Sequence, residues 1–223
     1  MTIDLVPNRF LVRVCHPVVY LAGIPDDEED LFHLPDSSRV NNFAEMDGLG
    51  NFADIRVAWN EGGLAFEVEV RGKQQPVMGD AAKPRLSDGL SLWIDTRDTR
   101  TSHRATRFCH QFHFLPTGGG PDGDEPVFVQ HKINRALQDA PLASGDVVGF
   151  RCQITASGYR MAIFLPAEAL HGFDPEQNPR LGLFYLLRDG ELGEQSLGAA
   201  TDLPISDDPS LWSLIELVDT GAK

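Results

Sequence analysis

The stretch from Asp88 to Pro116, DGLSLWIDTRDTRTSHRATRFCHQFHFLP, decides the fold because two alternating segments flank a basic loop. In residues 89–95 and 108–115, side chains alternate in character with the two-residue period of a β-strand. One face of this pair would carry Leu90, Leu92, Ile94, Phe108, His110, Phe112 and Phe114. The other face would carry Ser91, Trp93, Asp95, Arg107, Cys109, Gln111 and His113. The stretch therefore predicts two strands with one apolar face and one polar face that bears a large aromatic side chain.

The same alternation occurs on both sides of this stretch. Residues 55–70 predict a hairpin that turns at Asn60 to Gly63, and residues 146–165 predict a second hairpin about Ala156 to Gly158. Further strands are expected at residues 127–133, 181–187 and 211–218. Residues 10–20 are also strand-like, but Pro17 makes them an edge strand or breaks them in two.

This spacing gives roughly ten to twelve short strands and no long amphipathic helix. It predicts an all-β fold, an antiparallel β-sandwich of jelly-roll type with long loops and at most one or two short helices. No shift in composition interrupts the pattern, so residues 1–223 are expected to form a single domain.

Charge limits the partners of the protein. The chain has 19 Lys and Arg against 33 Asp and Glu, a net charge of −14, which opposes binding to nucleic-acid phosphates. No apolar run is long enough to span a membrane, and the N-terminus does not resemble a secretory leader. We therefore expect no nucleic-acid or membrane partner and a cytoplasmic location, or an extracellular one if a leader has been removed.

The loop between the two central strands is the one concentrated basic segment. It carries Arg97, Arg100, Arg104 and Arg107 against a single acid, Asp98. Guanidinium groups there would clamp a carboxylate or phosphate of a ligand, or they would pair with acidic side chains of the protein itself. The sequence favours the structural role, because a chain with 33 Asp and Glu offers many carboxylates with which these arginines can pair.

Three segments carry a resemblance to a known family. They are ADIRVAWNEGGLAFEVEV at residues 53–70, SDGLSLWIDTRD at residues 87–98, and GYRMAIFLPAEALHGFDPEQNPRLGLFYLLRDG at residues 158–190. Together they resemble the family-nine carbohydrate-binding modules and their DOMON-like relatives, over most of residues 36–218. The resemblance implies a β-sandwich that binds a glycan or another polar small molecule without catalysis. It also implies that a structural calcium ion is possible and that no other cofactor is needed.

Sugar binding of this kind places the apolar face of a pyranose on an aromatic ring and its hydroxyl groups on polar side chains. Trp93 is the best platform, and Asp95, Arg107, Gln111 and His113 are the expected ligand-binding partners if the two strands are adjacent. Alternatively, a loop covers Trp93 and Asp95 serves a turn. If calcium binds, Asp95 and Asp98 are the expected ligands.

Enzymatic function has less support. The sequence contains no GxSxG or HExxH motif, and Asp88 and Asp95 point to opposite faces of one strand, unlike a glycosidase pair. His110 and His113 also fall on opposite faces, which argues against a shared metal ion. The alternatives to glycan binding are a protein-interaction or assembly domain on the same sandwich, and an enzyme with an unrecognised site.

Overall fold

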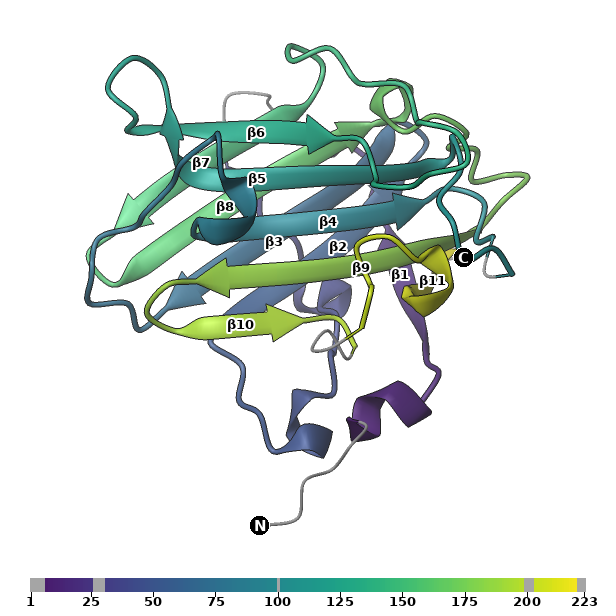
Figure 1. The fold of residues 1–223 in the computed structure, drawn as a ribbon, viewed down its shortest axis with the longest axis horizontal. Coiled ribbons are helices and arrows are strands. Elements are labelled where there is room, and N and C mark those ends of the chain that lie inside the picture. The colour runs from purple at the N-terminus through teal and green to yellow at the C-terminus, as the bar shows by residue number, and fades with distance from the viewer. Residues whose placement is uncertain (1–6, 26–30, 100, 199–202, 220–223) are drawn as a thin grey trace.

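The computed structural model describes residues 7–25, 31–99, 101–198 and 203–219 (Figure 1). These residues form eleven strands: β1 (Cys15–Tyr20), β2 (Ala53–Asn60), β3 (Gly63–Arg71), β4 (Gly89–Asp95), β5 (Cys109–Gly119), β6 (Glu125–His131), β7 (Gly149–Thr155), β8 (Gly158–Pro166), β9 (Arg180–Asp189), β10 (Gly193–Ser196) and β11 (Ser213–Val218). Their helical elements are six 3₁₀ turns: η1 (Asn8–Leu11), η2 (Asp36–Ser38), η3 (Ala44–Asp47), η4 (Pro84–Leu86), η5 (Ala167–Ala169) and η6 (Pro209–Leu211). No helix in these ranges is both long and apolar enough to cross a membrane.

The strands form one continuous sheet that folds over into two layers. Its order is β6-β5-β4-β9-β11-β1-β2-β3-β8-β7, and β10 pairs with β9 beside β11. Strands β6, β5, β4, β9 and β10 make the layer nearer the viewer, and β2, β3, β8 and β7 lie behind them (Figure 1). Strands β11 and β1 join the layers, and the edges β6 and β7 lie close together. The predicted all-β sandwich is confirmed.

The central pair and both hairpins form at the predicted positions. Strand β4 lies antiparallel to β5, with Trp93 opposite Gln111 and Ser91 opposite His113. The hairpins β2–β3 and β7–β8 turn where the Asn, Gly and Ser residues indicated. Period-two alternation was sufficient here because the two faces of each of these strands differ in polarity.

The edge position expected for the first strand is wrong. Strand β1 lies inside the sheet and runs parallel to both neighbours, pairing with β11 from Cys15 to Val19. It pairs with β2 only at Val19 and Tyr20, so that side of the strand is unpaired at Pro17. A proline is tolerated there for this reason, since it cannot donate to a sheet ladder.

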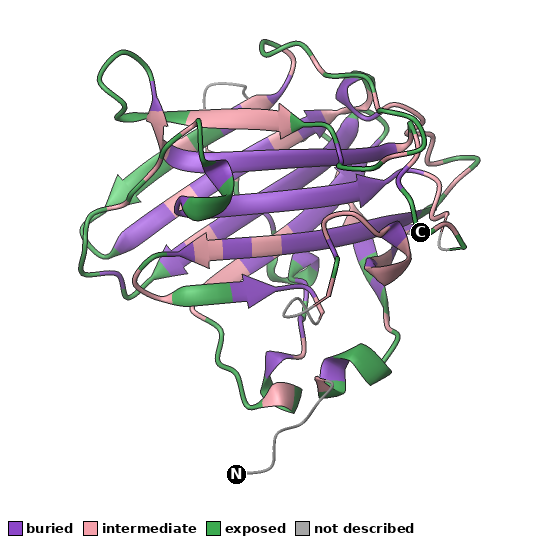
Figure 2. Cartoon of the chain, in the orientation of Figure 1, coloured by how far each residue is buried: buried purple, intermediate pink, exposed green. Residues whose placement is uncertain are grey.

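The main core fills the space between the two layers. It combines the inward side chains of β4, β5 and β9 with those of β2, β3 and β8, including Leu92, Phe112 and Met161, which are fully buried. Figure 2 shows β4 and β5 buried along almost their whole length, whereas β6 at the sheet edge is half-buried or exposed. Because β4 and β5 are buried on both faces, other residues of the chain must also cover their outer face.

A buried lysine links the two layers at one end of the sandwich. Lys73, just after β3, places its Nζ 3.0 Å from Asp88 Oδ2 and 2.9 Å from Asp189 Oδ1, and all three side chains are at most 3% exposed. Burial disfavours the ammonium, but the hydrogen bonds and charges of Asp189 and Asp88 outweigh it and raise the pKa of Lys73. Asp88 precedes β4 and Asp189 ends β9, so one cation holds both layers together.

Replacing Lys73 by Met should lower the free energy of unfolding by about 3–5 kcal/mol, because two buried carboxylates would lose their counter-charge. Chemical denaturation measures this change. Lys132→Met is the matched control, since Lys132 is 59% exposed and pairs with Asp139 at the surface, which is worth less than about 1 kcal/mol. Equal effects of the two substitutions would show that the buried cluster does not stabilise the fold.

Candidate functional site

The outer face of β4 and β5 collects three of the predicted ligand-binding residues. Trp93 lies opposite Gln111 across the β4–β5 ladder, and His113 lies opposite Ser91. On the other side of β4, Phe184 of β9 lies opposite Trp93. The two strands are adjacent, which was the condition set for this site, and their pairing brings Trp93, Gln111 and His113 together.

This face is covered, so the expectation of an open Trp93 platform is wrong. Trp93 is only 3% exposed, and its ring packs 5.7 Å from the ring of Phe184 and 6.2 Å from that of His113. Loop residues complete a second, smaller core around it, formed by Trp93, Ala105, Cys109, Ile133, Phe184, Ile205 and Trp212. The physical reason is that the covering loops contribute apolar side chains that bury the indole.

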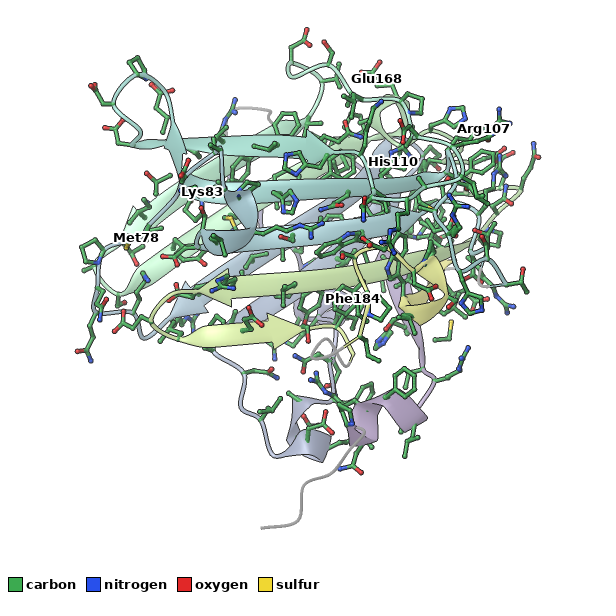
Figure 3. The ribbon with its side chains drawn as sticks, viewed as in Figure 1. Met78, Lys83, Arg107, His110, Glu168 and Phe184 are labelled. Carbon is green, nitrogen blue, oxygen red and sulfur yellow. The ribbon has the colours of Figure 1, made fainter. Side chains whose placement is uncertain are left out.

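A groove of about 250 Å³ nevertheless remains beside Trp93. The side chains around it come from η4, β4, β9 and residues 203–206, and η4 lies in front of β4 and β5 (Figure 1). Phe184 lies near the middle of the layer in Figure 3. The residues around the groove are Pro84, Arg85, Ser87, Gly89, Ser91, Trp93, Phe184, Leu186, Arg188, Leu203, Ile205 and Ser206. We refer to this space as the Trp93 groove.

A chain of hydrogen bonds runs beneath the Trp93 groove. The Nε2 atom of His113 lies 2.9 Å from Gln111 Nε2, and its Nδ1 atom lies 2.7 Å from Ser91 Oγ. His113 is fully buried, and burial together with the charges of His131 and Arg85 lowers the pKa of His113 to about 3. The ring is therefore neutral, with one donor and one acceptor nitrogen.

The direction of this chain follows from the Gln111 amide. Its N–H donates to Nε2 of His113, which leaves the proton of the neutral ring on Nδ1, and Nδ1–H then donates to Ser91 Oγ. The hydroxyl hydrogen of Ser91 is left free to donate elsewhere. Gln111 and His113 thus lie behind Ser91, the residue that borders the groove.

The other two predicted ligand-binding residues lie away from the groove. Both oxygens of Asp95 accept hydrogen bonds from the following turn: Oδ1 from Arg97 N at 3.0 Å, and Oδ2 from Thr99 N and Oγ1 at 2.7 Å each. Arg107 places its guanidinium 5.0 Å from the ring centre of Phe108, at one end of the layer (Figure 3). Asp95 therefore serves a turn, as the alternative interpretation of the sequence proposed.

The basic loop is largely tied to the protein itself. Arg97 also stacks on Phe108, at 5.2 Å, and Arg104 donates to the backbone oxygen of Arg135 at 2.8 Å. Arg100 lies outside the described residues. The structural role favoured for this loop thus accounts for Arg97, Arg104 and Arg107, although their partners are rings and carbonyl groups rather than acids.

Sequence reasoning missed Arg85, Arg188 and Phe184. Arg85 lies in an irregular loop where no period predicts its direction. The segment at residues 181–187 is continuously apolar, so it shows no alternation that would predict which side chains face outward. In the structure, the register of β9 against β4 places Phe184 opposite Trp93 and Arg188 opposite Gly89. Knowing that register would have placed both residues on the outer face.

The residues proposed for calcium do not fit the ion. The Asp95 carboxylate already accepts three hydrogen bonds, and Asp98 lies in the same turn, with its N–H on the Asp95 carbonyl oxygen at 3.4 Å. Among the described residues, no group of three or more His, Cys, Asp or Glu side chains is arranged to hold a metal ion. Calcium would have to displace donors that this turn already supplies.

Comparisons with solved structures agree with this architecture. A family-nine carbohydrate-binding module from Caldicellulosiruptor kristjanssonii in complex with cellotriose superposes with a TM-score of 0.60, covering 93% of this chain and 95% of that chain at 14% identity. The chain has the fold of the family-nine carbohydrate-binding modules. A structure of such a module from the same organism with glucose gives a TM-score of 0.53, 13% identity, and coverage of 77% and 78%. No protein-family model and no curated protein matches the sequence.

Chelation should leave the melting temperature of the protein unchanged, because the turn at Asp95 is held by its own hydrogen bonds. Thermal unfolding with EDTA, and again with added CaCl₂, measures this. A melting temperature that rises with calcium and falls with EDTA would restore the predicted structural ion.

His113 should make stability depend on pH in the acid range. Below its ordinary pKa of 6.5 the unfolded chain takes up a proton there, whereas the folded protein does so only near pH 3. The free energy of unfolding therefore falls as pH drops from about 6.5 to about 3, by up to about 1.4 kcal/mol per pH unit. His110, whose pKa burial lowers to about 4, adds to the same fall.

His113→Gln should make the pH dependence of stability less steep by about one proton, as measured by urea denaturation between pH 3.5 and 7.5. His33→Gln is the control for an exposed imidazole, since that side chain is 75% exposed. An unchanged slope in the His113 variant would mean that the folded protein does take up this proton.

Proposed function

We propose that this protein binds a glycan, without catalysis, in the Trp93 groove. The observation that supports the site is that the groove combines an apolar side with uncommitted polar atoms on one sheet face. Phe184, Leu186 and Trp93 supply the apolar side, and Ser91 supplies a hydroxyl hydrogen that no described residue accepts. The solved modules of this fold were captured with cellotriose and with glucose, which supports a sugar as the ligand class.

The size of the groove favours a small part of a glycan. At about 250 Å³ it is smaller than typical small-molecule sites, which hold roughly 300–1,000 Å³. It is therefore suited to one sugar unit at a chain end rather than to a long stretch of polysaccharide. A sugar presents an apolar face of C–H groups and a rim of hydroxyl groups, and the groove offers partners for both.

The chemistry of the groove favours binding without reaction. None of the described residues around it is Asp or Glu, so they offer no carboxylate to serve as a general acid, base or nucleophile. Glycoside hydrolysis ordinarily needs two such groups on either side of the bond. The imidazole nearest the groove, His113, is held neutral beneath Ser91 and has both nitrogens occupied. A protein-binding role for the same sandwich stays a prediction.

Blocking the groove should abolish glycan binding. Ser206 is half-buried at its side, so Ser206→Trp would fill the space with an indole and should remove binding of any glycan that a glycan array identifies, with cellotriose as the first soluble probe. Isothermal calorimetry measures the loss. The large Trp93 itself is a poor target, because truncating a buried indole would destabilise the fold.

Ser157→Trp is the matched control, because Ser157 lies in the exposed β7–β8 turn and not at the groove. It should bind as the unmodified protein does. Equal binding by Ser206→Trp and the unmodified protein would place the glycan elsewhere, and the absence of any glycan ligand for the unmodified protein would remove the proposed function.

A further inference from the structure

We propose that the glycan recognised by the Trp93 groove is acidic: its terminal sugar carries a carboxylate, as a uronic acid does. This inference rests on the proposed function and specifies the charge of the ligand. It follows from the polar groups that the groove leaves without partners, which are mostly hydrogen-bond donors and include a full positive charge.

Arg85 supplies that charge. It is exposed at the groove, on η4, and its guanidinium makes no hydrogen bond or ion pair with any residue that the structure describes. Many other arginines of this acidic chain are paired with carboxylates: Arg9, Arg39, Arg56, Arg71, Arg160, Arg180 and Arg188. In a chain of net charge −14, Arg85 thus brings a positive charge without a described counter-charge to the groove.

Arg85 lies close enough to the base of the groove for its charge to act on His113. Arg85 and Ser91 border the same groove, so the guanidinium lies on the same side of the sheet as Ser91. Its charge also contributes to lowering the pKa of the buried His113 ring beneath Ser91. A planar guanidinium offers five N–H donors in a fork that matches the two oxygens of a carboxylate. At the groove, Arg85 can thus meet a carboxylate that reaches Ser91.

Further donors surround it. The hydroxyl hydrogen of Ser91 is free, because Ser91 Oγ accepts from Nδ1 of the neutral His113 ring. The indole Nε1 of Trp93 is buried and has no partner among the described residues. Arg188 uses Nη1 in its 3.0 Å contact with Glu194, which leaves its other amino group available. A ligand that satisfies Arg85, Ser91 and Arg188 must be rich in acceptors.

The acceptors on the protein side are few. The described residues around the groove include no Asp or Glu. Glu194 and Asp207 contact the groove residues Arg188 and Ser206, but no described carboxylate pairs with Arg85. Ser87 and Ser206 donate their own hydroxyl hydrogens to nearby oxygens and offer lone pairs only. Sugar hydroxyl groups can donate to those two serines, while a carboxylate accepts from Arg85 and Ser91. An acidic sugar supplies both.

The test compares two ligands that differ only at C6. Cellotriose is the neutral probe, and the trimer of β-1,4-linked glucuronate is its carboxylated counterpart. By calorimetry in 50 mM NaCl, the glucuronate trimer should bind at least about tenfold more tightly than cellotriose. The advantage should shrink in 500 mM NaCl, because salt screens an exposed guanidinium.

Arg85→Gln should reduce the preference for the glucuronate trimer over cellotriose to about one. Arg13→Gln is the matched control: it removes the same charge from an exposed arginine away from the groove and should keep the preference. Because Arg85 makes no described hydrogen bond or ion pair, its replacement should leave the melting temperature unchanged, which checks that the variant is folded.

The outcomes separate the two proposals. If cellotriose binds, Ser206→Trp abolishes that binding and the glucuronate trimer is not preferred, the acidic ligand is overturned while glycan binding stands. If the preference exists but survives Arg85→Gln, the role of Arg85 is overturned. If the unmodified protein binds neither trimer but binds a glycan of the array that has no carboxylate, the acidic ligand is overturned while glycan binding stands. If it binds no glycan at all, both proposals fail together.

Discussion

The arrangement of this molecule depends on strand β4, which is hydrogen bonded along both sides, to β5 and to β9. That double pairing fixes the direction of every side chain on the strand. Leu90, Leu92 and Ile94 enter the core between the layers, and Ser91 and Trp93 point the other way. The apolar half of β4 thus supports the fold, and the same backbone holds the floor of the candidate site in place. A change of register by one residue would exchange the two faces.

The candidate site shows how burial and charge act together. Loops cover most of the outer face, which turns an open aromatic surface into a small recess beside Trp93. Burial keeps His113 neutral, and the neutral ring fixes the orientation of Ser91. In contrast, Lys73 keeps its charge in an equally buried place because two carboxylates meet it. The presence or absence of a counter-charge, rather than depth alone, decides which buried groups are ionised.

Much of the fold could be predicted from the sequence, because strands whose two faces differ in polarity show a two-residue period. The β2–β3 hairpin and the β4–β5 pair were predictable for this reason. The position of β1 was not, since pairing between the two ends of a chain leaves no local pattern and Pro17 pointed to an edge. The relation to DOMON-like domains stays a prediction.

The site was less predictable than the fold. Alternation placed Trp93, Gln111 and His113 on one face but could not show that Ile133 and Ile205 would cover it. Ile133 lies just beyond the end of β6, although the sequence predicted it inside that strand, and Ile205 lies in a loop where no period indicates direction. Arg85 was not predictable for the same reason. The basic loop at residues 97–107 was a candidate because its charges are concentrated. Arg85, which has no described hydrogen-bond or ion-pair partner, lies outside that loop, and only the three-dimensional arrangement shows that it is unpaired.

The place of β1 has a consequence for how the chain acquires its structure. Strand β1 comes early in the sequence but runs alongside β11, near the other end, and these two strands join the layers. During synthesis the hairpins can form as they emerge from the ribosome, whereas this seam must wait until residues 213–218 are available. Closure is thus a late, long-range event, and such contacts are slow to form because a large loop must be closed first. Until then the incomplete sheet exposes unpaired strand edges, which can pair with other chains. Pairing of β11 with β1 removes these edges at the seam.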